Sequence, residues 1–228
     1  MKYSLRINRK GRRVVAFLIL TFMCCVVSVS FVNVGRASDD RTRTRAERAL
    51  REGEYETAER LYRELLARDA HDNSARLGLS FALYKQRNFQ DAYDHAARVV
   101  GNDPLSSRAH ALLGAAVLAS GDFHLSVEEF RTALSIRENE ALAIAGLALV
   151  DFYEGRLDRS LLGFRRAASL DSNEPDYIYS LAQSAARTER YKEAADAYER
   201  FLVIAPRTDE DRRAPHGRVP HIYSFRDN

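Results

Sequence analysis

The chain is organised by a repeat of thirty-four residues. A row of large side chains marks the repeat and recurs without insertion or deletion: Tyr55, Phe89, Phe123, Leu157 and Tyr191. A row of small residues keeps the same period: Ala58, Ala92, Ser126, Ser160 and Ala194. A third row is aromatic at four of its five positions: Tyr62, Ala96, Phe130, Phe164 and Tyr198. Several rows with one period predict five copies of the same structural unit.

Each unit contains two segments with apolar residues at helical spacing. In the second unit these segments cover residues 77–84 and 89–100. The polar run 85–88 between them has the length that joins antiparallel helices. Gly53, Gly121 and Gly155 stand where a helix should end, because glycine adopts a left-handed conformation without a Cβ clash. Alternation with period two is not sustained, so the pattern predicts an all-α fold.

A thirty-four-residue pair of amphipathic helices with small residues at the crossing resembles the tetratricopeptide repeat. The resemblance covers residues 39–208 and includes a leucine followed by a small residue in the first helix of four units: Leu79 with Ser80, Leu113 with Gly114, Leu147 with Ala148, and Leu181 with Ala182. The first unit departs from the pattern, since Arg45 replaces the leucine. The repeat-ending proline is present as Pro104 and Pro206, and other residues replace it in three units: Ala70, Glu138 and Ser172.

The resemblance implies a right-handed α-solenoid of five helix-turn-helix repeats. Their expected boundaries are 39–72, 73–106, 107–140, 141–174 and 175–208. One helix pair cannot bury its apolar face alone, so stacked neighbours form a continuous core. We expect the aromatic side chains of Phe130 and Phe164 to fill this core between the units.

The N-terminus has the pattern of a membrane-targeting segment. Residues 1–13 hold six basic residues and no acidic ones, and residues 14–34 carry no charge. This apolar run exceeds the roughly 7 to 15 residues of a signal-peptide core and is long enough to cross about 30 Å of hydrocarbon as a helix. We expect a basic cytoplasmic head followed by one uncleaved transmembrane signal anchor. The alternative is a signal peptide cleaved after about residue 37.

A short basic head before a long apolar run is typical of a signal anchor that exports the part of the chain after it. Five arginines also lie close behind the span, so the basic residues on its two sides differ by only one. We expect a single-pass membrane protein with an extracytoplasmic, periplasmic array; the alternative is an array that faces the cytoplasm. Cys24 and Cys25 lie within the apolar run, so the remaining sequence has no thiol for a disulfide or a metal site.

Composition and motifs argue against nucleic-acid binding and catalysis. Residues 1–37 hold seven of the 35 basic residues and none of the 32 acidic ones, so the rest of the chain has a net charge of −4. The six histidines show no spacing typical of metal ligands, and we expect them on exposed helix surfaces. Neither a phosphate-binding glycine loop nor a Gly-x-Ser-x-Gly motif occurs. We therefore expect no nucleic-acid partner, no metal, no cofactor and no enzymatic activity.

The resemblance also implies a concave groove, lined by the first helices of the repeats, that holds an extended peptide or a partner helix. The residues expected to line it are Arg43, Arg51, Leu77, Phe81, Tyr84, Lys85, Leu118, Phe152, Tyr153, Tyr179, Gln183 and Arg187. The alternative for Leu77, Leu118 and Leu149 is that neighbouring helices cover them. Chaperone-binding members hold a C-terminal carboxylate with asparagines and lysines on this face. At the matching positions this chain has other residues: Glu47, Phe81 and Ala115, or Gly78 and Leu112. We expect recognition of apolar partner side chains, oriented by arginine contacts.

Residues 209–228 have no period, and we expect a disordered tail there. A solenoid without a terminal cap leaves its last helix uncovered, which predicts partial exposure of Phe201, Leu202 and Ile204. The sequence favours a membrane-tethered scaffold that binds a protein partner in bacterial envelope assembly or secretion. The alternatives are a structural subunit that self-associates through the last repeat, and a cytoplasm-facing adaptor that recruits a client to the membrane.

Overall fold

The computed structural model describes residues 38–205, and the regular structure in this range is helical. Residues 38–51 form the first helix. The later helices are α2 (Tyr55–Arg68), α3 (Asn73–Lys85), α4 (Phe89–Asn102), α5 (Ser107–Ala119), α6 (Phe123–Ile136), α7 (Ala141–Tyr153), α8 (Leu157–Leu170), α9 (Pro175–Arg187) and α10 (Tyr191–Ile204). The predicted all-α solenoid of helix pairs is confirmed.

The predicted membrane segment 14–34 lies outside the described residues, as do the basic head 1–13 and the tail 209–228. Within residues 38–205 no helix combines the length and the apolar character that crossing a membrane requires. The single transmembrane helix therefore stays a prediction.

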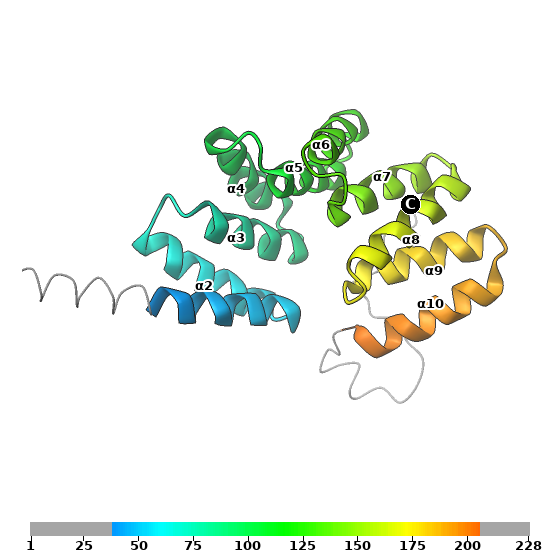
Figure 1. Ribbon diagram of the computed structural model, residues 1–228, viewed down its shortest axis with the longest axis horizontal. Coiled ribbons are helices and arrows are strands. Elements are labelled where there is room, and N and C mark those ends of the chain that lie inside the picture. Colours follow the sequence, from blue (N-terminus) through cyan, green and yellow to red (C-terminus); the bar gives the residue numbers. More distant parts are fainter. Residues whose placement is uncertain (1–37, 206–228) are drawn as a thin grey trace, which may run out of the picture.

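The helices alternate in length with the repeat. The first helix of the second to fifth pairs has 13 residues, and the second helix of every pair has 14. Each helix packs against the next one in the chain, and the first helices of successive repeats also touch, as α5 does with α7. Figure 1 shows the resulting stack as an arch, with residues 38–51 at one end and α10 at the other.

Polar side chains begin many of the helices. The carboxylate of Asp72 accepts a hydrogen bond from the backbone N–H of Ala75, and Asp122 caps α6 in the same way. Such caps satisfy backbone donors that have no partner inside the helix. Such a cap helps to fix the start of the helices that have one, whereas α7 begins without a side-chain cap.

One position of the repeat requires a left-handed backbone after the first helix. Gly53, Gly121 and Gly155 have φ values of 76°, 89° and 77° there, as the sequence predicted. Arg87 and Glu189 take the same conformation, with φ of 64° and 58°, although they have a Cβ. The turn that joins the two helices of a repeat therefore keeps its geometry even where the residue is unfavourable for it.

Helices approach one another closely around Phe130, whose side chain is fully buried. The Phe130 ring packs on the backbone of Gly114 in α5 and of Gly146 in α7. A Cβ added at Gly146 would lie 2.1 Å from Cζ of Phe130, and one at Gly114 would lie 2.9 Å from the same ring. Phe164 is also buried, with 2% exposure. The predicted core role of both aromatic residues is confirmed.

Buried hydroxyl groups at the helix crossings find hydrogen-bond partners. Ser80 donates to the carbonyl oxygen of Ala92 at 2.7 Å, and the Ser160 and Ser184 hydroxyls lie 3.0 Å apart. A small polar residue is therefore tolerated at the crossing, because its burial leaves no unpaired group.

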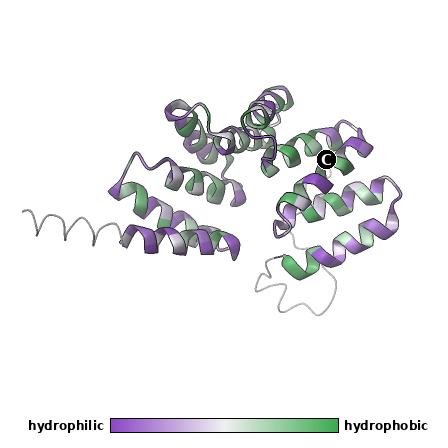
Figure 2. Ribbon diagram, in the orientation of Figure 1, coloured by the Kyte–Doolittle hydropathy of each residue, from purple (hydrophilic) through white to green (hydrophobic). Residues whose placement is uncertain are grey.

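Helices at the centre of the arch are buried more completely than those at its ends. Figure 2 shows α7 as mostly hydrophobic along its length, whereas α2 and α10 mix hydrophilic and hydrophobic residues. Leu77, Leu118 and Leu149 are partly buried and pack against the core. The alternative that neighbouring helices partly cover these three leucines is confirmed.

We predict that Gly146→Ala lowers the free energy of unfolding by about 1–3 kcal/mol, because the new methyl group must displace the enclosed Phe130 ring. Urea unfolding followed by circular dichroism measures this change. Gly101→Ala is the matched control, since a Cβ at this exposed position in α4 meets no atom within 4 Å. It should leave stability unchanged or raise it by up to about 1 kcal/mol. Equal losses in both variants would contradict the close contact at Gly146.

Candidate partner-binding surface

An aromatic strip lies along the edge of the arch where first helices end and second helices begin. We define the aromatic strip as Phe123, Phe152, Tyr153 and Arg187. The ring of Tyr153 meets that of Phe123 edge-on at 5.9 Å and that of Phe152 at 6.1 Å. The guanidinium carbon of Arg187 lies 4.8 Å from the centre of the Phe152 ring. Three helices, α6, α7 and α9, thus contribute to one surface.

The strip remains accessible although its rings contact one another. Phe123 is 39% and Tyr153 49% exposed. Edge-on rings offer both an apolar face and a polarised edge, and Arg187 adds a cationic donor beside them. This combination suits an apolar partner side chain next to a carboxylate or carbonyl oxygen.

The predicted groove residues at the end of α3 have a different environment. The ammonium group of Lys85 lies 2.5 Å from Oε1 of Glu174 and 2.7 Å from Oδ2 of Asp176, and its side chain is only 8% exposed. Burial raises the pKa of the neighbouring Tyr84 phenol to about 12. The start of α9 therefore covers this part of the predicted groove.

A second charge pair, in which only the carboxylate is buried, lies next to this contact. The carboxylate of Glu140, 4% exposed, accepts a hydrogen bond from Nη1 of Arg108 at 2.9 Å. The guanidinium of Arg108 also stacks on Phe81, with 4.9 Å between the guanidinium carbon and the ring centre. Phe81 thus lies near two cations, because Lys85 Nζ is 5.5 Å from the centre of the same ring.

The N-terminal members of the predicted set are divided between internal contacts and solvent. Arg43 donates to Asp72 at 2.5 Å and to Ser74 at 2.6 Å, so it fastens the first helix to α3. Arg51 is exposed. Arg43 thus has its partners within the chain, whereas Arg51 faces solvent.

The C-terminal members are also divided. The Tyr179 ring packs against Tyr198 at 6.0 Å and Phe201 at 5.1 Å, inside the last repeat. Gln183 is half-buried, and Arg187 belongs to the aromatic strip. The structure thus brings together Phe152, Tyr153 and Arg187, and divides the rest of the predicted set among covered contacts, local contacts and solvent.

Sequence reasoning did not assign several residues of these clusters. Phe123 was used only as a marker of the thirty-four-residue period. Its place at the start of the second helix of a repeat was the signal that could have assigned it to this surface. Glu174 and Asp176 flank the proline that begins α9, but nothing local indicates their distant partner. The expectation that the histidines are exposed is wrong for His110. It is 8% exposed, with Nδ1 2.7 Å from Glu129 and Nε2 3.1 Å from the carbonyl oxygen of Pro104.

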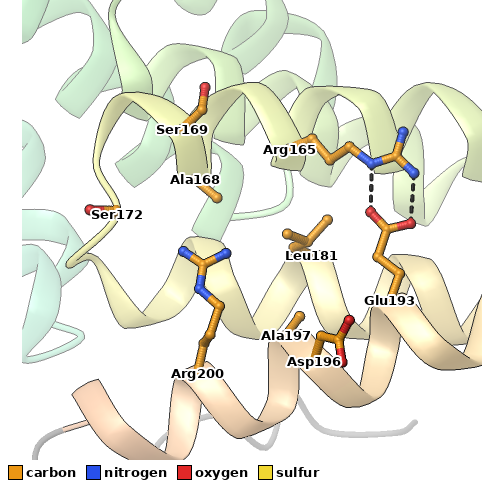
Figure 3. A pocket seen from close by; sticks show the side chains of 9 residues that line it. All are labelled: Arg165, Ala168, Ser169, Ser172, Leu181, Glu193, Asp196, Ala197 and Arg200. Carbon is orange, nitrogen blue, oxygen red and sulfur yellow. Dashed lines mark hydrogen bonds and ion pairs between the residues drawn. The ribbon is translucent and has the colours of Figure 1, made fainter.

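A shallow hollow of about 490 Å³ lies among α8, α9 and α10 (Figure 3). Arg165 closes one side of it with two hydrogen bonds to Glu193, at 2.5 and 2.6 Å, while Arg200 points into the hollow. Within residues 38–205, His, Cys, Asp and Glu side chains form no group of three that could hold a metal ion. The hollow is an open depression lined by both polar and apolar side chains.

Comparison with protein families agrees with this architecture. Two models of the tetratricopeptide repeat match the chain, one over residues 49–116 and the other over residues 146–208. Together they cover more than half of the sequence. The chain therefore belongs to the tetratricopeptide repeat family, whose members bind other proteins.

Anaphase-promoting complex subunit 3 of Schizosaccharomyces pombe is 30% identical over 119 residues, which make up 52% of this chain. The matched part spans only 18% of that relative. Among solved structures, a thermophilic tetratricopeptide-repeat protein of Thermus thermophilus aligns with a TM-score of 0.63 at 19% identity, over 76% of this chain and 95% of its own. MamA of Desulfovibrio magneticus aligns with a TM-score of 0.47 at 22% identity, over 75% and 97%.

We predict a pH-dependent effect of Asp72→Asn, which keeps a cap for Ala75 but removes the charge beside Arg43. Burial alone would raise the pKa of Asp72, but hydrogen bonds from the Ala75 backbone and from Arg43 outweigh it and lower that pKa. The charged form therefore stabilises the fold above the unfolded-state pKa of about 4, and this contribution is lost as the pH falls through the folded-state pKa.

Asp72→Asn should cost about 1 kcal/mol at pH 7, and its difference from the unchanged chain should shrink below about pH 4. Urea unfolding between pH 3 and pH 7 measures both. Glu64→Gln is the control, because the pair of Glu64 with Arg68 is exposed and should contribute less than about 0.5 kcal/mol. A difference that stays constant with pH would rule out the charge as its cause.

Proposed function

We propose that the chain is a scaffold that binds a segment of a partner protein through the aromatic strip. The observation that carries this proposal is the exposed contact chain Phe123–Tyr153–Phe152–Arg187. Aromatic and arginine side chains are the residue types that dominate binding energy at protein interfaces. The partner segment presents an apolar side chain to the rings and an acidic or carbonyl group to Arg187.

We further propose that residues 14–34 tether the array to a membrane. The support is the uncharged run behind a basic head, which is long enough to cross a bilayer. With the head in the cytoplasm the array lies in the periplasm, where it positions partners for envelope assembly or secretion. An array on the cytoplasmic side is an adaptor that recruits its client to the membrane.

A second candidate function is self-association through the last repeat. Leu202 in α10 is 59% exposed, whereas Ala168, one repeat earlier at the same position, is 4% exposed because the following repeat covers it. Val203 beside it is 82% exposed. The expected exposure is wrong for Phe201, which is 1% exposed because its ring packs in the core of the last repeats, and Ile204 is partly buried against the same core. A second copy that covers this end would build an oligomer without using the aromatic strip.

A photo-crosslinking amino acid placed at Tyr153 should capture the partner in cells that express the chain naturally, while one at Ser135, an exposed position of α6, should not. A third placement at Leu202 reports self-association through a product of twice the chain mass. Mass spectrometry of the crosslinked bands distinguishes the two functions.

The double substitution Phe152→Ala with Arg187→Ala should lower the crosslink yield at Phe123 by at least about tenfold, as expected for residues at the centre of an interface. Leu162→Ala is the control, because this side chain is 62% exposed on α8 and lies outside the strip. Undiminished crosslinking in the double variant would refute the strip as the binding surface.

Protease protection tests the proposed side of the membrane. In spheroplasts, a tag at the C-terminus should be digested from outside, and the full-length product should retain its N-terminal segment. A protected tag would instead place the array in the cytoplasm. A product shortened by about 37 residues would identify a cleaved signal peptide.

A further inference from the structure

Lys85 joins two parts of the array that are far apart in the sequence. It ends α3 in the second repeat, and its ammonium group contacts Glu174 and Asp176 at the start of α9 in the fifth repeat. These helices lie on the two arms of the arch (Figure 1). The other ion pairs within residues 38–205 join residues that are at most about one repeat apart. The Lys85 contact is therefore the charged link across the arch.

The link is enclosed by aromatic side chains. Besides its two carboxylates, the ammonium group lies 5.5 Å from the centre of the Phe81 ring and 5.9 Å from that of Tyr55. Burial alone would lower the pKa of Lys85, but Asp176 and Glu174 outweigh it and raise that pKa well above its ordinary value. Burial, aided by the charge of Asp176, raises the pKa of Glu174 although Lys85 opposes this shift. The site thus places one ammonium group beside two carboxylates, whose negative charge it compensates.

This contact also limits how accessible the inner face of α3 is. Phe81 and Tyr84 are half-buried, and they lie against Arg108, Lys85 and the carboxylates of α9. In a solenoid each repeat is stabilised by its neighbours alone. A contact across the arch can therefore break while every repeat stays folded.

We propose that the contact of Lys85 with Glu174 and Asp176 is an autoinhibitory latch. The latched array covers Phe81 and Tyr84, and release of Lys85 exposes them to a partner segment. A basic partner side chain takes the place of Lys85, because the vacated site keeps two carboxylates beside aromatic rings. The identity of the partner rests on the proposed scaffold function, whereas the latch itself does not.

The latch is tested in the full-length chain by the distance between its arms. Cys24→Ser and Cys25→Ser leave the chain without thiols, so that spin labels can be attached to new cysteines at Gln90 and Ser172, both at the protein surface. Double electron–electron resonance should give one narrow distance distribution in this background. Lys85→Glu places three carboxylates together and should shift the distribution to longer distances.

Glu174→Lys combined with Lys85→Glu restores a pair of opposite charges and should return the short distance. Arg165→Glu is the matched control, because the ion pair of Arg165 with Glu193 joins adjacent repeats and does not cross the arch. It should leave the distribution unchanged. If Lys85→Glu lowers the helical circular dichroism signal, Lys85→Met replaces it, since this variant removes the charge at similar size; it too should lengthen the distance.

An unchanged distance in Lys85→Met, or a charge swap that fails to restore the short one, would overturn the latch. Neither result depends on a partner, so failure of the latch is distinct from failure of the aromatic strip. If the latch holds, crosslinking from Tyr84 to partners should increase in Lys85→Met relative to the unchanged chain. Equal crosslinking from Tyr84 in both would show that latch opening does not control access.

Discussion

The enclosure of Phe130 by two glycine backbones is the contact on which the arrangement of the arch depends. Because Gly114 and Gly146 have no side chains, α6 lies close enough to α5 and α7 to join two repeats through a single ring. This close approach buries the central first helices on most of their sides. Accessible aromatic groups are consequently left at helix ends, which explains why Phe123 and Tyr153 meet at the edge of the array and not along the middle of its inner face.

The sequence was sufficient to predict the fold because each repeat places the same residue types at the same helix crossings. Phe164 could be assigned to the core in this way, and so could the left-handed turns at glycines. Arg87 and Glu189 carry no local sign of the same conformation, since their backbone is imposed by the flanking helices. These two turns were therefore not predicted, although they stand one repeat away from the glycines that were.

The surface was harder to predict, for a physical reason. The curvature of a solenoid is the sum of small rotations between successive repeats. The sequence of one repeat therefore does not show whether the two arms of the arch contact each other. Lys85 was expected at the rim of an open groove, yet its partners lie about ninety positions away. No local pattern in the sequence indicates such a pairing. Tyr179 illustrates the same limit, because only the packing of the last repeat directs its ring toward Phe201.

The fixed lengths of helices and turns have a consequence for how such a chain can change. First and second helices of 13 and 14 residues are joined by turns of three and four residues. Loss of one residue inside a helix would turn the side chains after it by about 100°, away from the neighbouring helix. Single-residue insertions and deletions within the helices should therefore be disfavoured. Whole repeats, in contrast, can be duplicated or removed in frame, and the exposed α10 is the place where the array can lengthen without disturbing the repeats before it.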